Sequence, residues 1–396
     1  MKFTFDTSKA VDRLMKILAV EGTTGKEKKI GKTIVQLLRE MGVASKSIRF
    51  DNASENIPLP TETGNLIVDL PGTIPGPRIL LMTHMDTVPL CAGAVPILEK
   101  NKIVTNGKTA LGGDNRTGCG VLLTTVATLL EQKLPHPPIT LLFTVREESG
   151  LFGARFVDLS LLKNPEFAFN FDGKFAHEIT IGAVGGERWE VEITGLAAHA
   201  GVHPDHGISA TMVAALAMEE IYRTGWFGKI IKDGKEGTSN VGVIGNGKGG
   251  SAGEATNVVT DYVHIRGESR SFDVKFLKTI TQTYRNAFLE AGKKISNHQG
   301  KKAKVQFHSR LDYRPFHLSE KAPVVAKGLS AVEQIQRQPI CRTTNGGLDA
   351  NWMVAHGIPT ITFGAGQNEI HTVKEWIDLN EFLHGCQLGV VLATQS

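Results

Sequence analysis

The sequence has few cysteines and no long hydrophobic run. Its four cysteines lie far apart, without the paired spacing of a zinc finger or a disulfide framework, at Cys91, Cys119, Cys341 and Cys386. No stretch approaches the ~18 consecutive apolar residues of a membrane span. Asp6 stands where a signal peptide would need an apolar segment. We therefore expect a protein of the cytoplasm, a reducing compartment, with no membrane partner.

An excess of charge of one sign is also lacking. The 44 basic and 40 acidic residues nearly cancel and leave a formal net charge of +4, whereas a polyanion-binding surface needs a strong basic excess. The densest run of lysines, within residues 293–304, lies beside a predicted turn and is interpreted as a solvated surface. We therefore expect no nucleic-acid partner.

The length predicts more than one domain. A chain of 396 residues exceeds the size at which one hydrophobic core usually stops growing. Its first part alternates helical segments with short apolar strands, which is typical of an α/β domain with helices on both faces of a sheet. The expected strands are residues 65–70, 78–83, 139–145 and 167–171, and the expected helices are residues 9–20, 26–42 and 117–132.

The pattern changes after Asp172, where glycines at 182, 185 and 186 mark a crossing into another domain. The next elements are strand, helix, strand, strand, helix and strand, the order of a ferredoxin-like α+β unit. From about Tyr313 the α/β pattern resumes with a helix, a strand and a last helix. The sequence thus predicts an α/β domain of residues 1–184 and 313–396, with an inserted ferredoxin-like domain of residues 185–312.

A histidine and an acid come directly after the strand 78–83. His84 and Asp86 lie two residues apart, so they point to the same side of an extended chain. A metal-bound histidine commonly donates its other ring N–H to a carboxylate, which makes Asp86 a candidate for orienting His84. A surface histidine in a loop explains this pair equally well when it is taken alone.

Two further acidic sites lie at the ends of regular elements. Asp114 comes after two glycines and just before a helix, where it is either an N-cap or, because the glycines allow close backbone approach, a metal ligand. Glu147 and Glu148 end the apolar strand 139–145, where adjacent carboxylates repel unless a cation lies between them. Strand alternation then predicts that one binds metal while the other reaches a metal-bound water.

Asp172 and His371 complete the set. Asp172 comes after the buried strand 167–171, and His371 comes after another strand and a glycine-containing loop. Open α/β sheets bind ligands outside the carboxyl ends of their strands, so these side chains are expected at one edge of the sheet. Five residues of the types that bind metals therefore converge, which outweighs the separate structural explanation of each.

These motifs together resemble those of the zinc peptidases and deacylases that include peptidase T, carboxypeptidase G and aminoacylase. The resemblance covers nearly the whole chain and is strongest to the peptidase T branch, through residues 111–114 and 267–271. It implies a mixed-sheet, phosphorylase/hydrolase-like catalytic domain and an inserted domain that serves as a lid and for dimerisation. The matching motifs are THMDTVP at 83–89, GGDN at 112–115, EESG at 147–150, DG at 172–173, HAG at 199–201, GGLD at 346–349, and His371.

The resemblance also implies two zinc ions per subunit, with Co²⁺ or Mn²⁺ as substitutes. It makes Asp114 the bridging ligand and Glu147 the general base. The two sites are then completed by His84 and Asp172 on one side and by Glu148 and His371 on the other. Asn115 departs from the pattern, since relatives often carry a second Asp there, but the bridging ligand itself is retained.

Residues of the inserted domain are implied to handle the substrate. His199 is expected to hold the developing oxyanion, sometimes in the active site of a partner subunit. Asn257 and Arg270 are expected to bind the substrate backbone or terminus, with Arg266 as a close competitor of Arg270. Gly346, outside the inserted domain, is also expected to bind substrate. Two further histidines near His199, at positions 203 and 206, are interpreted as loop residues that stabilise a turn.

The function expected on these grounds is an aminopeptidase that removes the N-terminal residue of short peptides and forms a homodimer through the inserted domain. A carboxypeptidase or an N-acyl amino acid deacylase shares the same metal machinery, and the sequence leaves this choice open. A metal-containing peptide-binding protein without activity is the alternative from another class. The intact Glu147 argues against it, because its substitution is the simplest way to lose catalysis and keep the metals.

Overall fold

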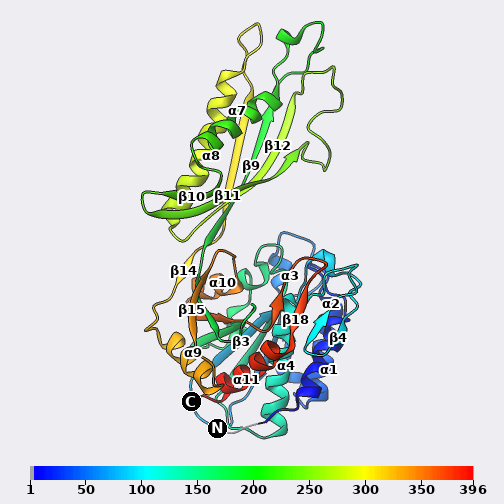
Figure 1. Ribbon diagram of the computed structural model, residues 1–396, viewed down its shortest axis with the longest axis vertical. Coiled ribbons are helices and arrows are strands. Elements are labelled where there is room, and N and C mark those ends of the chain that lie inside the picture. The colour runs from blue at the N-terminus through cyan, green and yellow to red at the C-terminus, as the bar shows by residue number, and fades with distance from the viewer. Residues whose placement is uncertain (1–3, 396) are drawn as a thin grey trace. The chain divides into compact units, whose positions relative to one another are not determined.

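The computed structural model describes residues 4–395, and within them the chain forms two compact units (Figure 1). The first unit contains the residues up to Gly182, His317–Thr344, and the residues from Leu348 on. The second unit contains Ala183–Phe316 and the short segment Asn345–Gly347. One α/β unit therefore holds both ends of the described chain, and the second unit is inserted into it.

The first unit is built on a nine-stranded mixed sheet, which confirms the expected fold class. The central strands β6, β3, β7 and β16 are parallel, whereas β2 and β8 run antiparallel to their neighbours β6 and β16. The strands lie in the order β1 (Ile48–Phe50), β2 (Leu66–Leu70), β6 (Ile139–Thr144), β3 (Ile79–His84), β7 (Phe167–Phe171), β16 (Thr360–Phe363), β8 (Glu178–Ala183) and β14 (Phe316–His317), with β15 (Ile340–Thr344) also beside β8.

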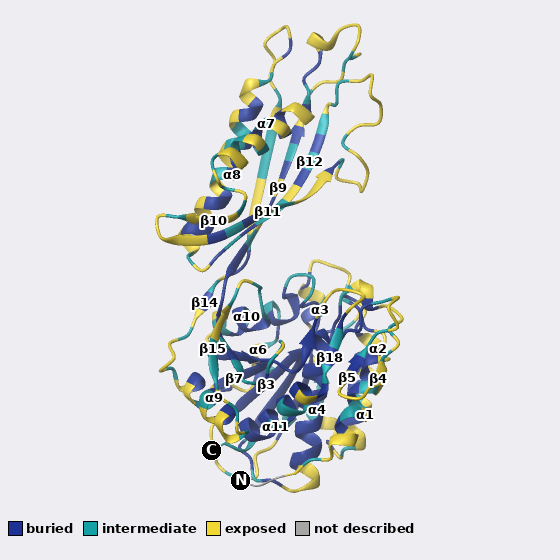
Figure 2. Ribbon diagram, viewed as in Figure 1, coloured by how far each residue is buried: buried dark blue, intermediate teal, exposed yellow. Residues whose placement is uncertain are grey.

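Helices cover both faces of this sheet because its central strands are apolar on both sides. In β3, Ile79 and Leu81 belong to one core cluster, and Leu80 and Met82 belong to another. Central α4 is buried along most of its length (Figure 2). The first face packs against α1 (Thr7–Leu18), α2 (Lys28–Glu40), α4 (Gly113–Glu131), α9 (Pro323–Gln334) and α11 (Leu379–Thr394), and the second against α5 (Phe152–Arg155), α6 (Leu159–Leu162) and α10 (Asp349–Ala355).

A small four-stranded sheet ties the C-terminal part of the first unit to an early loop region. Its central strands β18 and β5 are antiparallel, so the segment around residue 376 lies beside residues 102–104. This pairing brings the chain near Glu375 next to the start of α4. The strands lie in the order β17 (Gln367–Asn368), β18 (Trp376–Asp378), β5 (Lys102–Val104) and β4 (Ile97–Glu99).

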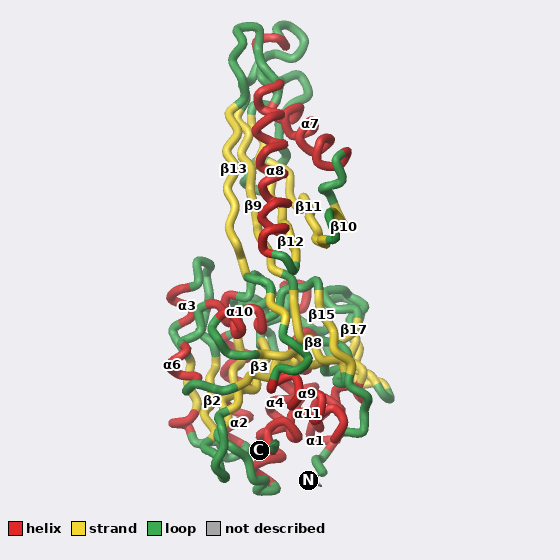
Figure 3. Tube along the Cα trace, turned by 90° about the vertical axis from the view of Figure 1, so that its left-hand side faces the viewer, coloured by secondary structure: helices red, strands yellow, loops and turns green. Residues whose placement is uncertain are grey.

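The second unit is an antiparallel sheet with two helices on one face (Figure 3). Trp189 is central to its core, with its ring 4.6 Å from that of Tyr284 on α8. The order of elements is that of a ferredoxin-like unit with one added hairpin strand, β10. The strands lie in the order β10 (Gly228–Lys232), β11 (Lys235–Gly245), β12 (Tyr262–Ser271), β9 (Gly185–Thr194) and β13 (Lys304–Tyr313), and the helices are α7 (Ala210–Arg223) and α8 (Val274–Lys294).

The helices of the described chain were also compared with the length and apolar character that a membrane span requires. Among residues 4–395, every helix is too short or too polar to cross a bilayer.

Candidate metal centre

Candidate ligands gather at the carboxyl end of the parallel strands in the first unit. His84 is the last residue of β3, Asp172 comes directly after β7, and Glu148 lies in the turn after β6. Because these three neighbouring strands run parallel, their carboxyl ends meet at one edge of the sheet. The parallel pairing therefore brings these side chains together.

A first group of ligand atoms is formed by His84, Asp114 and Asp172. The Nε2 atom of His84 lies 3.0 Å from Oδ1 of Asp114 and 3.9 Å from Oδ1 of Asp172. All three side chains are shielded from solvent, and that of His84 is only 2% exposed. The group is a compact cluster of one imidazole and two carboxylates.

A second group is formed by Asp114, Glu148 and His371, so Asp114 belongs to both groups. The Nε2 atom of His371 lies 3.0 Å from Glu148 and 3.3 Å from Oδ2 of Asp114. Asp114 thus presents one oxygen to each histidine. Its carboxylate is positioned as a bridge between two sets of ligands.

The ring of His84 is oriented from behind by Asp86, which is fully buried. The Nδ1 atom of His84 lies 3.1 Å from the backbone oxygen of Asp86 and 3.4 Å from its Oδ1. Both of these partners are acceptors, so Nδ1 carries a proton and donates it. The lone pair of the neutral ring is then on Nε2, the atom that faces Asp114 and Asp172, as in metal-bound histidines.

Glu147 and Glu148 are held by a turn and not by the strand alternation expected from the sequence. The strand β6 ends at Thr144, and Arg146 has a left-handed φ of 51°. The backbone N–H groups of both glutamates donate to the Asp86 carboxylate, at 3.0 and 3.2 Å. The expected alternation of the two side chains along a strand was wrong. The extended chain ends before Glu147, and the buried Asp86 carboxylate binds the backbone N–H groups of both glutamates.

The electrostatics of the centre suit bound cations. Burial, and then the charge of Asp114, raise the pKa of Asp172 to about 8 and that of Glu148 to about 7. Burial also raises the pKa of Glu147 well above its usual range. Hydrogen bonds to Asp114 and Glu148 raise the pKa of His371 to about 10. More carboxylates converge here than the imidazoles neutralise, and oxygen and imidazole ligands together fit divalent zinc.

Glu375 was not predicted from the sequence, although it positions the segment that carries Asp114. Its carboxylate is almost fully buried and accepts three backbone N–H groups: those of Leu111 and Gly112 at 2.8 Å and that of Asp114 at 3.0 Å. These partners are more than 260 residues away in the chain. No local pattern in the sequence indicated this contact.

Asn115 and Gln367 support the centre on its other side. The amide of Asn115 donates to the backbone oxygen of Phe171 at 2.7 Å and accepts from Gln367 at 3.0 Å. Gln367 also donates to Oδ1 of Asp172 at 3.4 Å. The amide of Asn115 is thus used as both donor and acceptor, which a carboxylate is not able to do.

All four residues that were expected to handle the substrate lie in the second unit. The Nδ1 atom of His199 accepts the backbone N–H groups of Gly201 and Val202, at 3.2 and 3.1 Å. Because those groups only donate, the ring proton of neutral His199 is on Nε2. The backbone oxygen of Asn257 accepts the N–H of Ala200 at 2.8 Å, which ties Asn257 to the same loop.

Gly346 lies in the second unit, within the short segment Asn345–Gly347. Arg270 reaches this segment, donating to the backbone oxygen of Asn345 at 3.2 Å and to both oxygens of Glu268 at 3.0 and 3.1 Å. Within residues 4–395, the side chain of its competitor Arg266 makes no ion pair or hydrogen bond.

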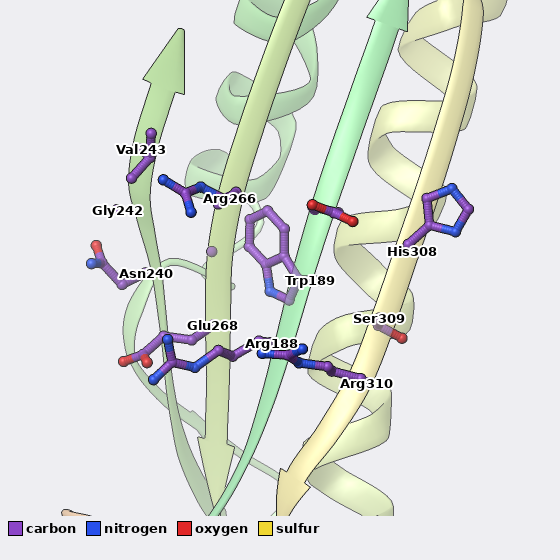
Figure 4. Close-up of a pocket in the computed structure, with 12 residues that line it drawn as sticks. Arg188, Trp189, Asn240, Gly242, Val243, Arg266, Glu268, His308, Ser309 and Arg310 are labelled. Atoms are coloured by element: carbon purple, nitrogen blue, oxygen red, sulfur yellow. The ribbon is translucent and has the colours of Figure 1, made fainter. Parts of the chain in front are cut away.

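Arg266 lines a pocket of about 590 Å³ on the second unit. Figure 4 shows it on β12 together with Glu268, across from Asn240 on β11. The pocket contains none of the candidate metal ligands, which belong to the first unit. Its mixture of arginines and glutamates suits polar groups of a ligand and not metal chemistry.

Comparison with known proteins relates the chain to peptidases. The profile of peptidase family M20/M25/M40 matches residues 80–395. The uncharacterized protein YqjE of Bacillus subtilis (strain 168) is 30% identical over 387 residues, which are 98% of each chain. The crystal structure of aminopeptidase PepT from Bacillus cereus ATCC 10987 covers 98% of each chain at 29% identity and a TM-score of 0.83. A tripeptidase from Staphylococcus aureus subsp. aureus mu50, at 24% identity, has the same fold with a TM-score of 0.87 over 98% of each chain.

Proposed function

The chain belongs to peptidase family M20/M25/M40, and from this premise we propose that it is a metal-dependent aminopeptidase that hydrolyses the N-terminal peptide bond of short peptides. The choice of aminopeptidase is supported by the Bacillus cereus PepT, which matches nearly the full length of the chain. The Staphylococcus aureus tripeptidase, which shares the fold, is consistent with a substrate of a few residues.

The observation that carries the proposal is the sharing of Asp114 by two ligand groups. We assign two zinc ions to these groups, with Co²⁺ or Mn²⁺ as substitutes. His84 and Asp172 would hold one ion, Glu148 and His371 the other, and Asp114 both. The oxygen of Asp114 that faces each histidine, at 3.0 and 3.3 Å, supports the bridging role.

When bound, the two ions supply Lewis-acid activation of the peptide carbonyl and of the attacking water. Glu147 is assigned as the general base. Its carboxylate accepts no hydrogen bond within the described residues 4–395, so it is available to take the water's proton and pass it to the leaving amine. Asp86 fixes this base through the backbone N–H of Glu147.

His199 is assigned to the oxyanion. The backbone amides at its Nδ1 leave the proton on Nε2, which makes that atom a donor. A neutral donor aimed at the carbonyl oxygen stabilises the negative charge that develops there. In this proposal the second unit serves as a lid, because His199 must be brought to the substrate from an inserted domain.

Substrate binding is assigned to Asn257, Gly346 and Arg270. Arg270 is supported by its contact with Asn345, which neighbours Gly346. The side chain of Arg266 has no hydrogen-bond or ion-pair partner within the described residues, and Arg266 is therefore the residue whose variant should be compared with that of Arg270.

The compartment we propose is the cytoplasm, in keeping with four free thiols. The assembly we propose is a homodimer through the second unit.

The experiment that tests this function is a substrate panel with and without a chelator. We expect the purified, zinc-loaded protein to release the N-terminal residue of tripeptides, and we expect the chelator to abolish this release. Blocking the N-terminus should prevent hydrolysis, whereas blocking the C-terminus should not. Preferred hydrolysis of N-acyl amino acids would make the chain a deacylase, and release of the C-terminal residue would make it a carboxypeptidase. Hydrolysis of none of these would favour a peptide-binding role.

A further inference from the structure

A second cluster of metal-ligand side chains lies in the second unit, on the turn just after His199. His203, Asp205 and His206 each offer one ligand atom, and these atoms lie within 4.8 Å of one another. The ring of His298, from the loop after α8, lies against that of His206 with centroids 4.2 Å apart. Three imidazoles and one carboxylate thus come together from two loops that are far apart in the sequence.

The backbone of this cluster is already held in place. The N–H of His298 donates to the backbone oxygen of Asp205 at 2.8 Å, and the side chain of Asn297 donates to that of His206 at 3.4 Å. The N–H of His206 donates to the backbone oxygen of His203 at 3.1 Å, which closes the turn. A ligand at the cluster would therefore meet a preformed backbone and would need only side-chain rotation.

The ring of His298 is oriented as in a metal ligand. Its Nδ1 atom lies 3.3 Å from the backbone oxygen of Asp205. A carbonyl oxygen only accepts, so Nδ1 is the donor and the lone pair of the neutral ring is on Nε2. A hydrogen bond from the second ring nitrogen to a backbone carbonyl is what commonly orients metal-bound histidines.

Packing does not account for the cluster. His203, Asp205, His206 and His298 are all exposed, so no hydrophobic burial brings them together. Within residues 4–395, no hydrogen bond or ion pair engages the ring nitrogens of His203 or His206, or the carboxylate of Asp205. The rings of His203 and His206 stack with their centroids 4.6 Å apart, so the turn is supported by this ring contact and not by hydrogen bonds of the side chains.

We propose that His203, Asp205, His206 and His298 form a second metal site, separate from the candidate metal centre of the first unit, for one late first-row divalent cation of the zinc and copper class. Imidazole nitrogens with one carboxylate are a ligand set that these ions prefer. Four such groups match the tetrahedral coordination of zinc. Hard cations such as Mg²⁺ and Ca²⁺ prefer oxygen ligands, so we expect the site to reject them.

The test measures bound metal and not activity, so it does not depend on the proposed peptidase function. The full-length protein is stripped with a chelator, dialysed against Zn²⁺, and its zinc content per chain is determined by atomic emission. The double variant His203→Ala/His206→Ala should hold one zinc fewer than the wild type. The matched control His308→Ala removes another exposed histidine of the same unit and should hold as much zinc as the wild type.

A second variant guards against an indirect effect on the turn. His298→Ala lies on the other loop, and we expect it to weaken zinc binding at this site at least tenfold while circular dichroism stays unchanged. Cu²⁺ bound to the wild type should also give an electron paramagnetic resonance component with nitrogen couplings that the double variant lacks. Equal zinc content in the wild type and the double variant, or loss of the same zinc in His308→Ala, would overturn the proposal.

Discussion

The most informative single change at the candidate metal centre is Glu375→Gln. The carboxylate of Glu375 accepts the N–H groups of Leu111 and Gly112 on one oxygen and that of Asp114 on the other, at 2.8 to 3.0 Å. Glutamine has the same shape but only one acceptor oxygen. At least one of the three amides must then face an NH₂ group and lose its hydrogen bond.

The lost hydrogen bond sets the size of the effect. A hydrogen bond to a charged group contributes about 1.5–3 kcal/mol, so losing one should lower the free energy of unfolding by about 2 kcal/mol. Because the segment carries Asp114, we also expect zinc affinity to fall by about tenfold to a hundredfold, as is usual when the group behind a ligand is changed. Urea unfolding of the metal-free protein and competition with a chromophoric chelator measure the two effects.

A matched control is Glu131→Gln at the far end of α4, where the side chain is exposed and its ion pair with Lys9 spans 3.8 Å. Exposed pairs of this kind contribute about 0–1 kcal/mol, so this variant should be nearly as stable as the wild type and should bind zinc equally well. Wild-type stability and zinc affinity in Glu375→Gln would refute the reasoning, since the three contacts would then not position Asp114.

Three other sets of residues can be tested in the same way. Glu147→Gln should abolish turnover with zinc content unchanged, whereas Glu148→Gln should lose zinc; the reverse pattern would exchange their roles. His199→Ala should slow the chemical step by about a hundredfold or more with zinc content unchanged, and wild-type turnover would remove the second unit from catalysis. Although burial opposes it, hydrogen bonds with His384, with the backbone N–H of Ala176 and with Arg337 lower the pKa of Glu381 to about 2. Ionised Glu381 then stabilises the fold above its unfolded pKa of about 4.5, and this stabilisation is lost as the pH falls towards 2. Glu381→Gln should thus be less stable by up to about 3 kcal/mol in urea unfolding at pH 7, and a gap that does not close at acid pH would contradict the assignment.

The candidate ligands could be located from the sequence because each one comes at the end of a strand, after a strand or at the start of a helix. His84 and Asp172 lie at the ends of apolar strands that are easy to recognise, and parallel pairing of those strands brings them to one edge. The hairpin of β10 and β11 was missed although Asp233 and Gly234 both have positive φ, at 52° and 71°, as an Asp-Gly type I′ turn requires. The Asp-Gly pair is therefore the local sequence signal of this hairpin.

Other features were beyond local reasoning. Glu375 has partners more than 260 residues away, and its role depends on the pairing of β18 with β5, two strands of three residues each. The turn at Arg146 is stabilised by the buried Asp86 carboxylate, which accepts hydrogen bonds from two consecutive backbone N–H groups. The apolar pattern of a strand gives no indication of such hydrogen bonds. The sequence alone therefore did not predict contacts between distant segments. It also did not predict where a side-chain carboxylate binds backbone N–H groups in place of a neighbouring strand.

The two halves of the candidate centre differ in their exposure to solvent: one half is buried and the other is partly exposed. His84 is 2% exposed and is held through Asp86, whereas the side chain of His371 is 45% exposed on a loop after β17. Asp114 belongs to both halves, so a buried, oriented set of ligands is joined through one carboxylate to a set that opens to solvent. Because the Glu148 side chain is only 6% exposed, His371 is the ligand through which this half meets solvent. Under the proposed function, we therefore expect water and peptide to approach from the side of His371, while the buried half fixes the geometry of the centre.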